Sequence, residues 1–403
     1  MADSLDGDKA RCAAERVDGV SIIVPTYNRA ALLPQSLATL SGQTVIPLEI
    51  LVIDDGSTDG TEQVVASLPG PIRYIKQANG GKSSAVNRGL SVARGSMIWL
   101  FDDDDWAEPD AIEKRLDALK AQPHLGFVGA AHFMGHADPQ GSKVVEHRRR
   151  MPQHSPDLIR VRLFEDCYFS LCSVLARREC FDVIGGFDAS LKSSEDYDVL
   201  LRLASRFEFT VLDEPVFTVR QHGGVRGAGD QAYAAHQRRE VFRQTDKRIG
   251  LKLRAELPLS GYVNQAIAPA EMSSEQRILA LANRAVVMAS KGLLDEMFQD
   301  LSALATFVAS EAGVQVPVPA DALRRTRDAL MCDYAFDAVQ DQCDDFVHAW
   351  RALRALGSAG RALAAELQYA LWRLARMRSS MPLSERAAKG KAWLRLAWHS
   401  WCD

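Results

Sequence analysis

The feature that most constrains the fold is an alternation of short apolar runs with helical stretches between residues 20 and 101. In chain order the segments read VSIIVP, ALLPQSLATLSGQ, LEILVID, TEQVVASL, IRYIKQ, SSAVNRGLSVA and SMIWLF. Strands this apolar, separated by roughly ten to fifteen residues with helical spacing, predict a mostly parallel sheet covered by helices on both faces. The fold class is therefore predicted to be α/β.

In such a sheet, ligands bind outside the carboxyl ends of the strands, so the residues directly after each strand are the candidates for function. Four segments hold these positions: TYN at 26–28, DDGSTDG at 54–60, NGGKSS at 79–84 and DDDD at 102–105. All four are polar, and two are strongly acidic. The sequence thus predicts a polar, acidic ligand site at one edge of the sheet.

The pattern becomes mixed after about residue 125. SLCSVLA and FEFTVLDEPVFTV have the composition of strands, and SEDYDVLLRLASR that of a helix with Ser194 as its N-cap. Beyond about residue 230 the sequence is rich in Ala, Leu, Arg and Glu with helical spacing. We therefore expect a polar tail over residues 1–18, an α/β region over 19–230 and a helical region over 231–403.

Composition excludes several classes of protein. The net charge of −4 over 403 residues provides no basic field for nucleic acid. The seven cysteines are odd in number and form no C-x-x-C pair, which argues against a disulfide framework or a zinc ribbon. The polar N-terminal stretch and the lack of eighteen consecutive apolar residues favour a cytoplasmic protein over a secreted or membrane-spanning one.

Four explanations compete for the aspartate run FDDDDW. A solvated charge run fits poorly directly after a strand, and calcium ligation of the EF-hand kind lacks the required glycine and glutamate. A nucleotide-hydrolysing phosphate loop around NGGKSS fails because Lys76 stands where its first glycine belongs. The fourth is a site for Mg²⁺ or Mn²⁺, which are held by one or two carboxylates together with substrate phosphates.

A second acidic cluster lies at the predicted start of the helix in SSEDYDVLL. Glu195, Asp196 and Asp198 fall in its first turn, where acidic residues favour the helix dipole. A carboxylate here could equally act as a general base on a sugar hydroxyl. The spacing alone leaves both interpretations open.

Four blocks together carry a family resemblance: VSIIVPTYNRAALLPQSLATLSGQ, LEILVIDDGSTDGT, GGKSSAVNRGLSVARGSMIWLFDDDDWAEPDAIEK and IGGFDASLKSSEDYDVLLRL. In this order and spacing, over about residues 19–225, the chain resembles the family 2 glycosyltransferases with the A-type nucleotide-sugar fold. The resemblance implies an inverting, metal-dependent transferase. Its donor would be a nucleotide-diphosphate sugar, with uridine as the favoured nucleoside.

The resemblance also assigns the nucleotide pocket. Pro25, Thr26 and Tyr27 would line it, and Asp55 would accept a hydrogen bond from the uracil N3–H. Lys82 lies where the family often places basic or small residues near the nucleotide, although a solvent-facing lysine explains it equally well. These residues are our candidates for substrate binding.

The aspartate run looks like the Asp-x-Asp motif of the family. Aligned on the downstream proline, Asp102 and Asp104 would be the metal pair for Mn²⁺ or Mg²⁺, with Asp104 first, and Asp103 would sit near the ribose. Four aspartates in a row leave this register ambiguous by one. His222 falls where relatives often carry a histidine that reaches the metal or diphosphate.

The Glu-Asp pair of the family corresponds to Glu195 and Asp196. Asp196 would be the general base that deprotonates the acceptor hydroxyl, with Glu195 as the alternative. The acceptor would be a saccharide, a lipid-linked sugar or a protein, in the synthesis of envelope polysaccharide, glycolipid or glycoconjugate. The competing hypothesis is a non-catalytic module of the same fold that serves as a scaffold or binds a ligand.

The last 53 residues are basic, with ten Lys or Arg against three acids in residues 351–403 and tryptophans among them. Basic amphipathic helices with aromatic side chains can lie on anionic membranes. Packing of the tryptophans in a helical bundle accounts for the same pattern. We therefore expect a cytoplasmic protein with possible peripheral contact at the inner face of the membrane.

Overall fold

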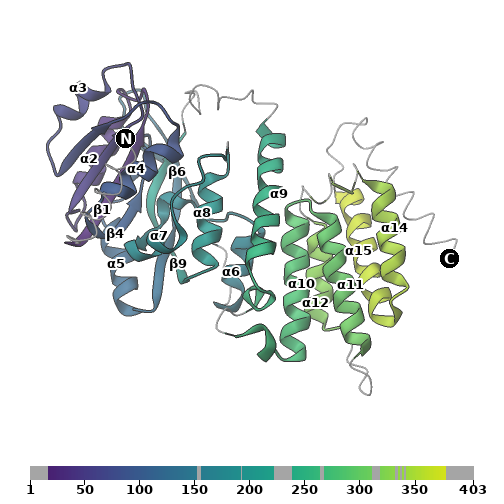
Figure 1. Cartoon of the computed structure of the whole chain (residues 1–403). Coiled ribbons are helices and arrows are strands. Elements are labelled where there is room, and N and C mark those ends of the chain that lie inside the picture. The colour runs from purple at the N-terminus through teal and green to yellow at the C-terminus, as the bar shows by residue number, and fades with distance from the viewer. Residues whose placement is uncertain are drawn as a thin grey trace. The chain divides into compact units, whose positions relative to one another are not determined.

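The chain forms two compact units in the computed structural model (Figure 1). Within the described residues, the first unit comprises 17–151, 167–191, 193–221 and 238, and the second comprises 156–166 and the residues after 238. The segment 156–166 thus packs with the helical unit, although it falls inside the predicted α/β region. The structure describes residues 17–151, 156–191, 193–221, 238–263, 267–310, 318–331, 335, 338–339 and 342–377.

The first unit is built on one sheet, to which nine strands of the described residues contribute. Their bounds are β1 Val17–Thr26, β2 Glu49–Asp54, β3 Ile72–Lys76, β4 Gly95–Leu100, β5 Trp106–Ala107, β6 Leu125–Ala137, β7 Lys143–Arg149, β8 Leu175–Arg177 and β9 Glu208–Arg220. The strand order is β3-β2-β1-β4-β8-β6-β9-β5, and β7 pairs with β6.

The two halves of this sheet differ in strand direction. β3, β2, β1 and β4 run parallel, as the sequence predicts. β8 is antiparallel to both β4 and β6, whereas β6 and β9 are parallel to each other. The carboxyl ends of β1, β2, β3, β4, β6 and β9 therefore lie at the same edge.

Helices cover the sheet as expected for the α/β class. Those of the first unit are α2 Leu33–Ser41, α3 Thr61–Ala66, α4 Lys82–Val92, α5 Ala111–Ala121, α7 Arg178–Ile184 and α8 Glu195–Ala204, with a 3-10 turn, η1, at Leu171–Ser173. Both faces of β1 are buried, since Ile22, Ile23 and Val24 are all inaccessible to solvent.

A close approach at Gly89 holds α4 against β1 and β2. A Cβ on Gly89 would lie 2.4 Å from Cγ2 of Ile23 and 3.3 Å from Ile53, so only glycine fits there. Because α4 is held against β1 and β2, its first residue, Lys82, is fixed beside the carboxyl ends of these strands.

The second unit is helical, as predicted. Its helices are α6 Pro156–Glu165, α9 Arg238–Glu256, α10 Ser274–Ser290, α11 Leu294–Ser310, α12 Ala320–Ala329, α14 Cys343–Arg354 and α15 Gly357–Met377. Ser273 and Gln276 form a capping box that starts α10. α10, α11, α12 and α15 pack side by side (Figure 1).

No helix of the described residues is both long and apolar enough to cross a membrane. The predicted peripheral membrane contact depends on residues 351–403, and positions 378–403 lie outside the part of the chain that the structure describes. That contact stays a prediction.

Candidate active site

The loops that follow β1, β2 and β4 meet at the carboxyl edge of the sheet. Thr26, the last residue of β1, donates a hydrogen bond from its hydroxyl to Oδ2 of Asp103 at 2.6 Å. Asn28 adopts a left-handed φ of 53°, and its side-chain oxygen accepts a hydrogen bond from the backbone N–H of Thr58 at 2.8 Å. The structure thus brings three of the predicted polar segments together.

Asp55 joins the loop after β2 to the start of α4. Its Oδ1 accepts hydrogen bonds from Nε2 of Gln77 at 2.8 Å and from the N–H of Gly80 at 2.9 Å, and its Oδ2 accepts one from the N–H of Gly81 at 2.7 Å. A carboxylate offers about four lone-pair positions. Three are occupied within the chain, which leaves one on Oδ2 for a ligand N–H.

The four aspartates after β4 point in different directions. Asp103 is buried against Thr26 and Arg29, whereas Asp104 lies 3.8 Å from Nη2 of Arg29 and remains partly exposed. Asp105 is buried, and its Oδ1 accepts a hydrogen bond from the backbone N–H of Arg220 at 2.9 Å. Asp102 is the most exposed of the four and faces Lys82.

Crowding and burial make two of these carboxyls hard to ionise. Burial and the neighbouring Asp104 raise the pKa of Asp103 to about 7, although Thr26 and Arg29 oppose the shift. Burial, Asp102 and Asp104 raise the pKa of Asp105 well above its usual value. The loop therefore holds negative charge at a cost that a bound cation would offset.

Lys82 connects this loop to the acidic start of α8. Its Nζ lies 2.9 Å from Oδ1 of Asp102 and 3.4 Å from Oδ2 of Asp196. Burial alone would lower the pKa of Lys82, but these two carboxylates raise it well above its usual value, so Lys82 is an ammonium. The candidate base and the candidate metal ligand therefore face one cation.

Desolvation raises the pKa of Asp196 to about 6; Lys82 opposes this shift, and Glu195 and Asp102 add to it. Two-thirds of the Asp196 side chain is shielded from solvent. A carboxyl with this pKa can be ionised at neutral pH and still accept a proton, as a general base must.

The backbone before Asp196 is strained. Ser194 occupies the N-cap position of α8 as predicted, but it has a left-handed φ of 56° and its side chain makes no capping hydrogen bond. Strained residues of this kind persist where the surrounding structure holds them. Asn87 holds the adjoining loop, because its side chain accepts a hydrogen bond from the N–H of Phe187 at 2.7 Å and donates one to its carbonyl at 2.9 Å.

The residues between these groups line a pocket. Pro25, Lys82, Asp102 and Asp196 all contribute to its wall, together with apolar side chains that include Phe187. Tyr27 is half-buried in the loop after β1, and Glu195 is half-buried in the first turn of α8. His222 lies outside the described residues, so its predicted metal contact is untested.

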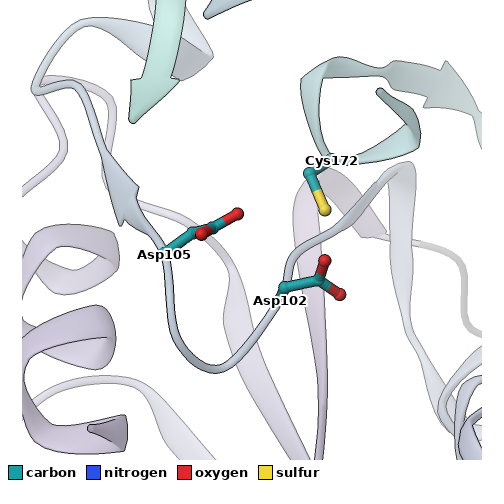
Figure 2. Close-up of side chains that lie close together, drawn as sticks. All are labelled: Asp102, Asp105 and Cys172. Atoms are coloured by element: carbon teal, nitrogen blue, oxygen red, sulfur yellow. The ribbon is translucent and has the colours of Figure 1, made fainter. Parts of the chain in front are cut away.

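The donor set fits a divalent cation. Asp102 and Asp105 lie with Cys172 so that one potential ligand atom of each falls within 4.8 Å of the other two (Figure 2). Asp104, the first choice from the sequence, instead turns to Arg29. The geometry thus favours Asp102 and Asp105 as the carboxylate pair. This spacing of three residues differs from the predicted pair of Asp102 and Asp104, and a one-residue shift of the register does not produce it.

Arg220 places a buried cation next to the acidic loop. Its guanidinium stacks 4.0 Å above the ring of Trp106 and is almost inaccessible to solvent. Nε and Nη2 have no hydrogen-bond partner within the part of the chain that the structure describes. Buried donors without partners are costly, and an anionic ligand at this edge would satisfy them.

The candidate list from the sequence missed Arg29, Cys172 and Asp105 as site residues. Arg29 directly follows the segment TYN, so its position after a strand was an available signal. Cys172 had none, because an isolated cysteine in a predicted strand shows no metal-binding spacing.

Comparison with known proteins bears on the family and the fold. Residues 21–185 match the profile of the family described as Glycosyl transferase family 2. This region contains the loops after β1, β2 and β4, and the loop between β3 and α4. Residues 21–185 are thus similar to glycosyl transferase family 2. The family resemblance inferred from the four sequence blocks is thereby confirmed.

Two curated relatives that match this chain are larger proteins. A hyaluronan synthase of Pasteurella multocida is 30% identical over 211 residues, which are 52% of this chain but only 21% of the relative. A chondroitin synthase of Escherichia coli is 27% identical over 251 residues, which are 61% of this chain and 35% of the relative. The matched stretch therefore spans about a fifth to a third of the length of these relatives.

Solved structures agree on the fold. A fragment of TarS from S. aureus, in complex with UDP-GlcNAc, superposes with a TM-score of 0.52 at 18% identity and covers 83% of this chain and 92% of that fragment. This likeness confirms the predicted A-type glycosyltransferase fold with a helical region after it.

Proposed function

We propose that this chain transfers a sugar from a nucleotide-diphosphate sugar to an acceptor hydroxyl, with inversion at the anomeric carbon and with a divalent cation. The observation that supports this best is the pairing of one ammonium, Lys82, with Asp102 at 2.9 Å and Asp196 at 3.4 Å. A cation ligand and a general base within reach of a single side chain fit a reaction centre between them.

The donor side of the site consists of groups suited to a nucleoside diphosphate. Asp55 keeps one acceptor position, which suits the N3–H of uracil, so a UDP-sugar is the favoured donor. Pro25, Thr26 and Tyr27 line the pocket for the nucleotide in this proposal. The unpartnered donors of Arg220 suit the oxygens of the diphosphate.

Asp102 and Asp105 would hold Mn²⁺ or Mg²⁺ in this proposal, with Asp104 beside them. When bound, the ion supplies electrostatic stabilisation of the charge that develops on the leaving diphosphate. Asp103 is tied to Thr26 at 2.6 Å and keeps the loop close to the nucleotide segment, next to which the ribose would lie.

The acceptor side follows from Asp196. Its carboxylate accepts the proton of the acceptor hydroxyl as that oxygen attacks the anomeric carbon, and the bond from this carbon to the diphosphate oxygen breaks on the opposite face. Lys82 keeps Asp196 ionised by its positive charge. Glu195 is the alternative base in the same turn.

The acceptor class is a saccharide, in polysaccharide or glycoconjugate synthesis. The support for this is the likeness to proteins named hyaluronan synthase and chondroitin synthase, which make polysaccharides. Lipid-linked and protein acceptors belong to the same proposal, because both present sugar hydroxyls or side-chain hydroxyls to the base.

The test compares the chain with Asp196→Asn in the presence of UDP-sugars, a saccharide acceptor and Mn²⁺. We expect the variant to lose transfer by roughly 10²- to 10⁴-fold, because the general base is gone. Donor binding should persist, measured as a donor-dependent rise in melting temperature. The configuration of the new glycosidic bond, read by NMR, tests inversion.

Asp198→Asn is the matched control, two residues further along α8. Asp198 is buried and paired with Arg202 at 2.6 Å, so this change should lower the melting temperature and retain transfer. If the unaltered chain bound the tested UDP-sugars but transferred none of them, a binding module would be favoured over an enzyme. Full transfer by Asp196→Asn would exclude Asp196 as the base.

A further inference from the structure

Cys172 directs an unpaired thiol into the acidic loop. Its backbone is fixed in η1, because its N–H donates to Oγ of Ser170 at 3.2 Å and its carbonyl accepts from Nε1 of Trp99 at 2.7 Å. The side chain is almost completely buried, and Sγ has no hydrogen-bond partner among the described residues. The side chain borders the hydrophobic core of the sheet unit, and the rigid backbone holds its thiol beside Asp102.

Asp102 and Asp105 complete a three-sided arrangement around this thiol. One carboxylate oxygen of each lies with Sγ in a group whose members are all within 4.8 Å of one another. Figure 2 shows Asp102 and Asp105 on the same loop, with Cys172 approaching from a separate segment. The two carboxylates belong to the loop between β4 and β5, and the thiol lies about 70 residues further along the chain.

This mixture of donors has a chemical preference. Mg²⁺ and Mn²⁺ are bound by oxygen ligands, whereas a sulfur ligand selects thiophilic ions such as Zn²⁺ and Co²⁺. Zn²⁺ accepts both thiolate sulfur and carboxylate oxygen as ligands, and a site with three protein ligands leaves its fourth position for water or substrate. We propose that Asp102, Asp105 and Cys172 form a binding site for a thiophilic divalent cation of the Zn²⁺ class.

Binding of the cation would replace Lys82 as the partner of Asp102. Lys82 now lies 2.9 Å from Asp102, and a dication there would repel its ammonium. The thiol would lose its proton to solvent as the metal–sulfur bond forms. The site exists independently of sugar transfer; only the consequence that Zn²⁺ competes with Mn²⁺ or Mg²⁺ at Asp102 rests on the proposed function.

The test is a Co²⁺ titration of the unaltered, untagged 403-residue chain without nucleotide, followed by absorption. We expect a thiolate-to-cobalt charge-transfer band in the near ultraviolet, which added Zn²⁺ removes. Cys172→Ser should lose the band. Cys167→Ser is the matched control from the same segment and should keep it, because the Cys167 thiol donates to the carbonyl of Phe169 at 3.3 Å.

Asp105→Asn gives a second measurement if Cys172→Ser fails to fold, which circular dichroism would reveal. This variant keeps the thiol and should bind Co²⁺ at least about 10-fold more weakly, because a ligand carboxylate is lost. No band in the unaltered chain, an equal band in folded Cys172→Ser, or unchanged affinity in Asp105→Asn would each overturn the site.

The result is separable from the proposed function. Mn²⁺-dependent sugar transfer by a chain that shows no cobalt band would overturn this site and leave the transferase proposal standing. A cobalt band that requires Cys172, in a chain that transfers no sugar, would support this site and overturn the transferase proposal.

Discussion

Asp300 in the helical unit and Asp103 in the sheet unit are both buried carboxylates, but their partners differ. Asp300 is held by two arginines: Arg284 contacts its Oδ1 through Nε at 3.0 Å and Nη2 at 2.6 Å, and Arg254 contacts its Oδ2. Asp103 has one hydroxyl at 2.6 Å and one arginine nitrogen at 4.0 Å. It also lies in a run of like charges.

The difference separates a structural acid from the acids of a ligand site. Two cations around one carboxylate neutralise it within the fold, which is a stable arrangement for α9, α10 and α11. The four carboxylates at residues 102–105 outnumber the cations beside them, and the arginine nitrogen that faces Asp103 lies 4.0 Å away. The raised pKa of Asp103 reflects this incomplete compensation. Charge that the fold leaves uncompensated is available to a ligand cation.

The largest effect should come from Asp300→Asn. Removing one member of a buried ion-pair cluster leaves the others without compensation, so the free energy of unfolding should fall by about 3–5 kcal/mol. Denaturant unfolding followed by circular dichroism measures this loss. The control is Asp321→Asn in the exposed pair with Arg324, which should cost less than about 1 kcal/mol. An equal loss of unfolding free energy in both variants would show that the buried cluster around Asp300 contributes no more than an exposed ion pair.

In metal-free protein, Asp103→Asn should raise the free energy of unfolding, whereas Asp300→Asn lowers it. The folded pKa of about 7 lies above the usual 3.8, so the folded state binds more protons than the unfolded state between about pH 4 and 7. Stability due to Asp103 is therefore lost as pH rises through this window. Asparagine still accepts the bond from Thr26, and the variant should be more stable by on the order of 1–3 kcal/mol at pH 8.

The measurement is denaturant unfolding of the whole chain in the presence of a chelator, at pH 5 and pH 8. The gain from Asp103→Asn should be smaller at pH 5, where the native carboxyl is largely protonated. A variant that is less stable than the unaltered chain at pH 8 would show that Asp103 is compensated as fully as Asp300.

The sequence could predict the sheet unit and much of the site because of one geometric rule. Parallel strands end at the same edge, so Thr26, Asp55 and Asp103 had to converge once the strands were recognised. The rule does not fix side-chain direction within DDDD, and Asp104 turned to Arg29 rather than toward Asp102. Cys172 reaches the site from a chain segment some 70 residues away, which only the packing of η1 on β4 determines.

A smaller effect is expected from removing Lys82, the cation that Asp102 and Asp196 share. Lys82→Met removes the ammonium 3.4 Å from Asp196, so the pKa of Asp196 should rise above about 6. In the proposed mechanism transfer requires ionised Asp196, so the rising limb of the pH–rate profile should move to higher pH. With saturating donor, activity should fall more at pH 6 than at pH 8.

Lys76→Met is the control for Lys82→Met. Lys76 pairs with Glu62 on the surface at the end of β3, and its removal should leave the pH profile in place. The same profile in Lys82→Met and the unaltered chain would mean that Lys82 does not set the ionisation of Asp196.

The smallest effect should come from Ser194→Gly. The left-handed backbone at Ser194 costs a non-glycine residue about 1 kcal/mol, and its hydroxyl makes no capping bond that would be lost. Glycine removes this strain but adds entropy to the unfolded state, so the net gain in the free energy of unfolding should be a few tenths to about 1 kcal/mol. Ser194→Val should instead destabilise, because a β-branched residue disfavours this conformation. If Ser194→Val retained stability but lost transfer, the strain would serve to aim Asp196. If it lost both, Ser194 would belong with Asp300 among the residues that hold the fold.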